Sequence, residues 1–285
     1  MTDATPAILS VAPNGARRTK ADHPAIPMTP ADLAAAAVSA QAAGASLIHL
    51  HVRDADGRHT LDPGIYREAT AEVRAAVGDG MIVQITTEAV GLYTPEQQIA
   101  TVRTVRPEAA SVALREIVPD DAGEALARDF YHWATDEGIH LQHILFTPEE
   151  VARFADLCAR GVIPGDDLTV LYVLGRYTVG QKSDPADLDP FLAAAKDVPA
   201  GLIGPWFVCA FGAKEGACVG HAIAHGGHAR VGFENNMLLP DGTTAPDNAA
   251  LVTEAAKAAA AARRTVATGA QARAILGMSR TPVSG

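Results

Sequence analysis

The chain has 285 residues, of which 48% are apolar and 20% charged, a composition typical of a soluble globular protein with a substantial core. Its formal net charge of −10 argues against a nucleic-acid-binding surface, which needs clustered Lys and Arg. No apolar stretch approaches the roughly 20 residues that span a bilayer, and the N-terminus does not have the pattern of a secretion signal. Three cysteines without paired spacing are typical of reduced thiols, so we expect a cytoplasmic protein.

Eight short apolar, β-branched runs recur along the chain and are expected to be strands. They cover residues 8–14, 46–52, 81–87, 111–117, 140–146, 168–174, 206–211 and 228–234. The segments between them are rich in Ala, Leu and Glu at helical spacing, and several open with a capping residue and a proline. Helices are expected over residues 29–44, 94–105, 147–161, 184–198 and 245–264.

Strands and helices alternate about every 30 residues, which indicates a parallel sheet covered by helices. An open doubly wound sheet would alternate in the same way. Eight units without a GxGxxG turn instead favour a closed (β/α)8 TIM barrel, a fold of the α/β class. The chain has no linker and no long low-complexity stretch, so we expect one domain over residues 1–285.

Polar side chains stand near the C-terminal ends of several predicted strands, which is where a barrel builds its active site. Although they are far apart in the sequence, the barrel would bring them to one mouth. They are Asn14, His49, His51, Thr86, Thr87, Arg115, Glu116, His143 and Glu234.

The run SLIHLHV places His49 and His51 two residues apart, so both point to the same face of a strand. Two imidazoles at that spacing can bind one zinc ion, or they can be buried histidines hydrogen-bonded to the backbone. Glu234 on the last strand favours the metal, because a buried carboxylate is rare unless it is paired or ligating. A site of two histidines and one carboxylate would leave a coordination position open for substrate or water.

The last strand also carries Arg230, whose planar guanidinium suits a substrate carboxylate, although a salt bridge to Asp54 or Glu116 would fit as well. His228, two residues earlier, is either a further metal ligand or a structural histidine. His143, near the end of the fifth strand, is either an acid/base group or a core histidine.

The blocks SVAPNGARRTKADHPAIP, GASLIHLHVRDADGRHTLDPGIY and GGHARVGFENN resemble the β-keto acid cleavage enzymes, and the similarity runs from end to end of the chain. The resemblance implies a zinc-bearing (β/α)8 barrel that assembles as a homotetramer. It also implies that a β-keto acid reacts with acetyl-CoA to give acetoacetate and the CoA ester of the remaining acyl group.

The resemblance further implies a role for each matching residue. The Zn²⁺ ion, one per subunit, would be held by His49, His51 and Glu234 and would polarise the β-carbonyl as a Lewis acid. The arginine matching Arg230 is catalytic in the family. The hydroxyl residue after the third strand corresponds to Thr86 or Thr87; we expect Thr86 in the catalytic set, and Thr87 and Asn14 among the substrate-binding groups.

Three positions depart from the family's type member. Asn235 stands where that enzyme has an aspartate, and an Asn cannot accept a proton as a carboxylate does. Arg17 replaces an acidic residue that meets the amino group of the type substrate, so we expect Arg17 to bind a substrate with a neutral or anionic distal group. His143 aligns with a glutamate on the fifth strand, and we expect Glu116 to take over part of its role. Asp54, in the turn after the second strand, is expected to partner a histidine or the arginine of the last strand.

Other readings of the sequence stay open. An amidohydrolase-type metal-dependent hydrolase also uses an HxH pair in a (β/α)8 barrel, but on the first strand. A class II aldolase polarises a carbonyl with zinc but would not have the HLHVRD and RVGFEN blocks together. The third alternative is a zinc-binding barrel without turnover, which Asn235 favours. The keto acid cannot be named from the loops NGARRTKADHPAIP and LGRYTVGQKSDP.

Overall fold

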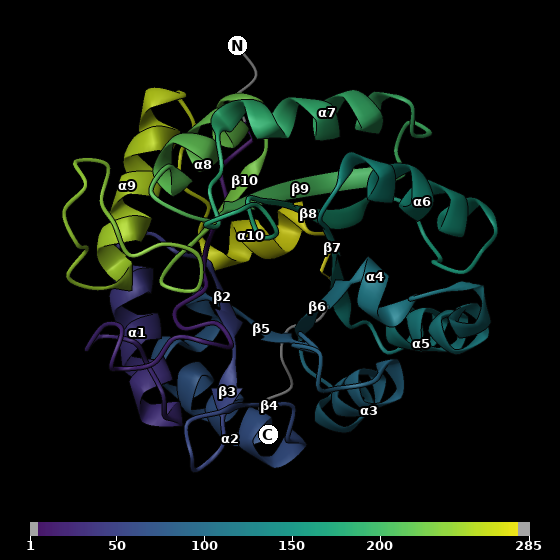
Figure 1. The fold of residues 1–285 in the computed structure, drawn as a ribbon, viewed down its shortest axis with the longest axis horizontal. Coiled ribbons are helices and arrows are strands. Elements are labelled where there is room, and N and C mark those ends of the chain that lie inside the picture. The colour runs from purple at the N-terminus through teal and green to yellow at the C-terminus, as the bar shows by residue number, and fades with distance from the viewer. Residues whose placement is uncertain (1–4, 279–285) are drawn as a thin grey trace.

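The computed structural model describes residues 5–278, in which eight parallel strands close into a barrel surrounded by helices (Figure 1). The order around the barrel is β1-β10-β9-β8-β7-β6-β5-β2, and β1 pairs with both β2 and β10 to close the sheet. This arrangement confirms the predicted TIM barrel. The barrel strands are β1 Leu9–Val11, β2 Leu47–Leu50, β5 Ile82–Thr86, β6 Ala109–Ala113, β7 His140–Leu145, β8 Leu168–Leu174, β9 Ile203–Ala210 and β10 His228–Val231.

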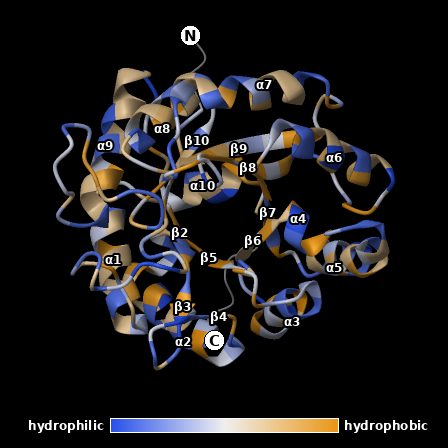
Figure 2. Ribbon diagram, in the orientation of Figure 1, coloured by the Kyte–Doolittle hydropathy of each residue, from blue (hydrophilic) through white to orange (hydrophobic). Residues whose placement is uncertain are grey.

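The helices begin where the capping chemistry of the sequence places them. The hydroxyls of Thr29, Thr94 and Thr147 each accept a hydrogen bond from a backbone N–H of the first helical turn, and each threonine is followed by a proline. Figure 2 shows apolar segments along the central strands and both polar and apolar residues on the surrounding helices. The helices are α1 Pro30–Ala42, α2 Pro63–Val77, α3 Pro95–Val105, α4 Leu114–Ile117, α5 Glu124–Asp136, α6 Pro148–Ala159, α7 Asp189–Lys196, α8 Glu215–Ala224, α9 Asn248–Ala261 and α10 Gly269–Ile275.

Several of the predicted strands end earlier than expected, and two of these differences bear on the mouth of the barrel. The run 111–117 divides after Ala113, and its second half forms the short helix α4, so Glu116 lies on a helix at the mouth. The run 228–234 ends as a strand at Val231, because Gly232 turns the chain with a φ of +138°. A Cβ at Gly232 would lie 2.4 Å from the carbonyl oxygen of Ala12, so only glycine allows this turn. Glu234 is therefore in a turn rather than in the strand.

Apolar side chains fill one end of the barrel and leave the other end polar. Inward-facing residues of successive strands form a cluster with Ala272 of α10 and Leu276 just beyond it. Figure 1 shows α10 lying across the middle of the ring of strands. The N-terminal end of the barrel is thus closed by an apolar plug, and the polar groups face the C-terminal mouth. Within residues 5–278 no helix combines the length and apolar character needed to cross a membrane.

Candidate active site

Three side chains with metal-binding atoms meet at the C-terminal mouth. His49 is in β2, His51 follows β2 directly, and Glu234 is in the turn after β10. His49 Nε2 lies 3.2 Å from His51 Nε2, and Glu234 Oε2 lies 3.8 Å and 3.5 Å from these two nitrogens. A tetrahedral ion with bonds of about 2.0–2.2 Å separates its ligand atoms by about 3.3–3.6 Å, so the triad fits a zinc-sized ion. No other group of three His, Cys, Asp or Glu within residues 5–278 meets the same geometric test.

The surroundings of this triad favour metal-binding protonation states. Burial, reinforced by the nearby Arg230, holds the pKa of His49 well below its usual value, so this imidazole is neutral and keeps a lone pair for a metal. Burial alone would raise the pKa of Glu234. The charge of Arg230 is the largest opposing effect, and the pKa of Glu234 is held well below its usual value. The site therefore offers a neutral imidazole at His49 and a carboxylate at Glu234.

Glu234 can occupy this position because the loop after β1 has a glycine at the point where it passes the carboxylate. Gly15 has a φ of +62°, and a Cβ there would lie 2.6 Å from Glu234 Cγ. The backbone N–H of Glu234 also donates to the carbonyl of Ala12, at 3.1 Å. The loop after β1 and the turn after β10 thus hold the glutamate from two sides.

Arg230 pairs with Glu234 rather than with Asp54 or Glu116. Its Nη2 donates to Glu234 Oε1 at 3.1 Å, and its side chain is only 5% exposed. Its Nε and Nη1 are buried and have no nitrogen or oxygen partner among residues 5–278. A buried guanidinium with uncommitted donors is suited to an anionic ligand.

Several of the expected catalytic and substrate-binding groups lie around two small cavities beside the triad. Thr86, Thr87 and Glu116 line one of about 40 Å³, and Asn14 and Arg17 line one of about 50 Å³. Asn14 Nδ2 donates to the carbonyl of His51 at 2.9 Å. Glu116 Oε2 accepts hydrogen bonds from Ala89 N at 3.0 Å and Gln98 Nε2 at 2.8 Å, and burial raises the pKa of Glu116.

Two charged residues that sequence reasoning missed stand between these cavities. Glu88 and Arg176 line both of them. Glu88 Oε1 pairs with Arg17 Nη1 at 3.0 Å and with Arg176 Nη2 at 3.5 Å, while Glu88 Oε2 lies 3.8 Å from His51 Nδ1. Glu88 directly follows the two threonines at the end of β5, so its place in the sequence was an available signal. Arg176 follows β8 in the loop LGRYTVGQKSDP, where only the loop's geometry reveals its position.

The structure corrects the expected position of Asp54. Its Oδ1 accepts hydrogen bonds from Asp56 N at 2.9 Å and Arg58 N at 2.8 Å. The carboxylate therefore holds the turn between β3 (Val52–Arg53) and β4 (His59–Thr60), where Gly57 has a φ of +78°. It does not partner a histidine or Arg230, because a short Asx turn satisfies it locally.

The structure corrects the expectation for His143 and decides between the two readings of His228. His143 packs between the rings of Tyr131 on α5 and Phe154 on α6, with centroid distances of 5.4 Å and 4.9 Å. Its side chain points outward from β7 into the helix layer, so the expected role in proton handling at the mouth is wrong. His228 Nδ1 accepts a hydrogen bond from Ile8 N at 3.0 Å, which makes His228 a structural residue rather than a further metal ligand.

Asn235 is fully buried beside Glu234, and its side chain makes no hydrogen bond within the described part of the chain. Both its Oδ1 and its Nδ2 are without a partner, whereas its backbone carbonyl accepts from Gly212 N at 3.3 Å. A buried amide without partners is uncommon in folded proteins.

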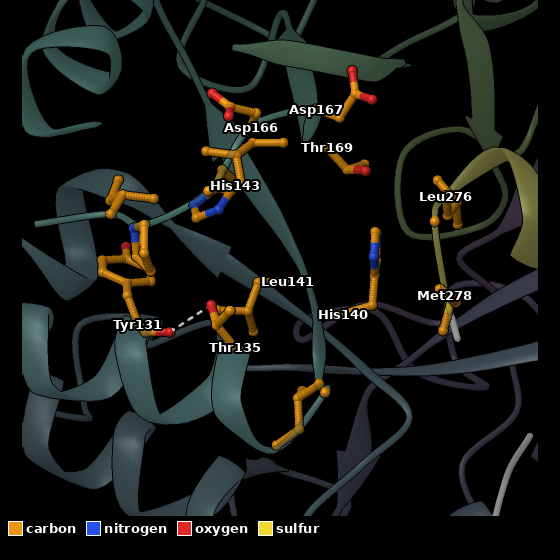
Figure 3. A pocket seen from close by; sticks show the side chains of 17 residues that line it. Tyr131, Thr135, His140, Leu141, His143, Asp166, Asp167, Thr169, Leu276 and Met278 are labelled. Atoms are coloured by element: carbon orange, nitrogen blue, oxygen red, sulfur yellow. Dashed lines mark hydrogen bonds between the residues drawn. The ribbon is translucent and has the colours of Figure 1, made fainter. Parts of the chain in front are cut away.

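A larger cavity, of about 440 Å³, lies at the other end of the barrel (Figure 3). It is lined by Tyr131 and Thr135 of α5, by the starts of β7 and β8, and by Leu276 and Met278. Volume alone would select it as the ligand site. The metal triad and the buried arginine are both at the opposite mouth, and we therefore assign the active site there.

A family model described as beta-keto acid cleavage enzyme matches residues 6–278. A "3-keto-5-aminohexanoate cleavage enzyme" from Fusobacterium nucleatum is 31% identical over 290 residues, covering 96% of this chain and 98% of that protein. A "3-oxoadipate:acetyl-CoA acetyltransferase" from Cupriavidus necator is 29% identical, covering 98% of each. Among solved structures, "Apo structure of ObcA" matches with a TM-score of 0.71 at 15% identity, covering 90% of this chain and 66% of that one, a likeness of fold.

The buried His143 predicts an acid-sensitive fold. Burial lowers the pKa of His143 to about 3 from the usual 6.5, so its contribution to stability is present above about pH 6.5 and is lost as the pH falls towards 3. The wild type should lose unfolding free energy between pH 7 and pH 4.5, as measured by urea denaturation. In His143→Leu we expect this loss to be smaller by about 2–3 kcal/mol. Tyr131→Phe is the matched control, because it alters the same cluster and leaves the imidazole in place. Equal losses in wild type and His143→Leu would contradict the prediction.

Proposed function

The chain belongs to the β-keto acid cleavage enzyme family, and we propose that it exchanges acyl groups between a β-keto acid and acetyl-CoA. In this reaction R–CO–CH2–COO⁻ and acetyl-CoA give acetoacetate and R–CO–CoA. The bond between R–CO and CH2–COO⁻ breaks, and the CH2 carbon forms a new bond to the carbonyl carbon of the acetyl group. R–CO passes to the CoA sulfur that the acetyl group has left. One combination carries the proposal: a three-ligand metal geometry beside a buried arginine with uncommitted donors, in a chain of this family.

We propose that His49, His51 and Glu234 hold one Zn²⁺ per subunit. Bound there, zinc would supply a Lewis acid for the β-carbonyl of the keto acid. The distances within the triad and the neutral His49 support this assignment. Asn14 would act as a binding group that also fixes the backbone at His51, through its hydrogen bond to that carbonyl.

Arg230 would bind the carboxylate of the keto acid. One donor is held by Glu234, and Nη1 has no oxygen or nitrogen partner among the described residues. Leaving a buried donor unpaired costs about 1–3 kcal/mol, which a substrate carboxylate would recover. Thr86 Oγ1 accepts from Glu88 N at 3.1 Å, so its hydroxyl proton is available to the substrate, whereas the Thr87 hydroxyl donates to Ser111 O at 3.0 Å.

Glu116 would accept a proton from the substrate, and Asn235 would hydrogen-bond to it. Both hydrogen bonds to the Glu116 carboxylate fall on Oε2, which leaves Oε1 to accept a proton, and the raised pKa suits a general base. The Asn235 amide would hydrogen-bond the substrate without moving a proton. Its buried, unpartnered atoms support this role.

The substrate would carry a neutral or anionic group at its distal end. Arg17 and Arg176 share the single carboxylate of Glu88, so this side of the mouth has an excess of positive charge. The Cupriavidus relative is named for 3-oxoadipate, a keto acid with a second carboxylate.

The homotetramer and the cytoplasmic location stay predictions.

The first test is acetoacetate formation. The zinc-loaded protein should produce it from acetyl-CoA and a panel of β-keto acids, and Glu234→Gln should lower zinc affinity and reduce turnover about 100-fold or more, because a metal supplies several kcal/mol of charge stabilisation. Glu254→Gln on α9, paired with Lys257 far from the site, is the control. A protein that holds one zinc yet makes no acetoacetate from any member of the panel would support a barrel without turnover.

Glu116 can be tested separately from the metal. Glu116→Gln keeps an oxygen for the hydrogen bonds from Ala89 and Gln98 but cannot act as a base. We expect about a 100-fold lower kcat with unchanged zinc content, in the range typical of a lost general base. Undiminished turnover would remove Glu116 from the mechanism.

The charge preference can be measured with paired substrates of equal length that end in a carboxylate or a methyl group. Arg17 is 55% exposed, so Arg17→Ala should reduce the preference in kcat/KM for the acidic substrate only about 2- to 5-fold. Arg176 is 14% exposed, and Arg176→Ala should reduce the same preference in kcat/KM about 10-fold or more. Arg58→Ala, on the exposed hairpin, is the control. Faster turnover of amino- or trimethylammonium-substituted keto acids by the wild type would contradict the assignment.

A further inference from the structure

Two glutamines continue the metal triad into the interior of the barrel. His49 Nδ1 lies 2.8 Å from Gln84 Oε1, and Gln84 Nε2 lies 3.4 Å from Gln142 Oε1. The exposed fractions of these three side chains are 1%, 0% and 2%. Each glutamine interrupts an apolar strand, in the runs MIVQITT and HLQHILF, where an amide has no packing advantage over leucine.

The two amides reach each other across an intervening strand. Gln84 is on β5 and Gln142 on β7, with β6 between them. On β6 the residues in register with them are small: Ala109 lies opposite Gln84, and Ser111 lies opposite Gln142. The small side chains leave the space in which the longer amides meet.

This chain of hydrogen bonds determines which nitrogen of His49 carries its proton. A carbonyl oxygen only accepts, so Gln84 Oε1 requires the N–H of the neutral ring to be at Nδ1. The lone pair of Nε2 then points to His51 and Glu234. Gln142 Oε1 faces Gln84 Nε2 and accepts from it, so flipping the Gln84 amide alone would place two acceptors together.

We propose that Gln84 and Gln142 are positioning residues that hold His49 in its metal-binding tautomer and orientation. The inference rests on the proposed zinc site. His51 has no equivalent support, since its Nδ1 has no hydrogen-bond partner among the described residues and the nearest carboxylate oxygen, on Glu88, is 3.8 Å away. Hydrogen bonds to the second nitrogen of a metal-binding histidine commonly contribute 10- to 100-fold in metal affinity, as an order of magnitude.

The test is zinc affinity, measured by competition with a chromogenic chelator at fixed pH. Gln84→Met removes the acceptor at about the same volume and should weaken zinc binding about 10- to 100-fold. Gln84→Glu keeps the acceptor, with the Gln142 amide turning to donate to it, and should bind within about threefold of the wild type or more tightly. Gln142→Met should cause a smaller loss, and Ser111→Ala, an inward-facing neighbour outside the chain of hydrogen bonds, should cause none.

The visible spectrum of bound Co²⁺ provides a second readout, which should change in Gln84→Met and stay unchanged in Ser111→Ala. Folded Gln84→Met that binds zinc as tightly as the wild type would overturn the inference. If Gln84→Met does not fold, wild-type affinity in folded Gln142→Met, or a large loss in Gln84→Glu, would overturn it instead. A wild-type protein that binds no zinc would overturn the proposed metal site itself, which separates the two failures.

Discussion

The structure depends on one carboxylate, Glu234, whose side chain is only 12% exposed. Glu234 lies in the turn after the last barrel strand, and burial opposes its charge, yet the neighbouring Arg230 keeps it ionised. A buried charge of this kind persists only when it is paired or ligating. The elements that hold it are glycine turns at Gly15 and Gly232, neither of which could accommodate a Cβ without displacing its neighbours.

The groups that could bind a metal and a substrate anion gather at one mouth of the barrel. α10 and inward-facing apolar residues pack together at the N-terminal end of the barrel, and the metal triad lies at the C-terminal mouth. There the triad is supported from below by Gln84 and flanked by Glu88 and Arg176. The reacting centre would thus be held by strands, which are rigid, and the distal part of the substrate would meet loops, which can vary between relatives.

The sequence was sufficient to predict the barrel and the pairing of His49 with His51, because strand periodicity and the HLH spacing are local properties. Glu234 was predicted from its place near the end of the last apolar run and from the family resemblance, although the structure puts it in the turn after β10. The orientation of His143 could not be predicted in the same way. Both faces of a parallel barrel strand are buried, so the apolar run HLQHILF does not indicate which residues face inward. The position of Arg176 could not be predicted because it depends on the path of a loop. Asp54 was placed wrongly because a local turn satisfies its carboxylate and competes with any longer-range partner.

The central claim is that zinc and a keto acid carboxylate meet between the triad and Arg230. The most direct measurement is a crystal structure of the protein soaked with acetoacetate, recorded at the zinc absorption edge. We expect an anomalous peak between His49, His51 and Glu234, with the carboxylate of acetoacetate bound by Arg230. No peak at the triad, or acetoacetate bound in the cavity at the N-terminal end of the barrel, would contradict the claim.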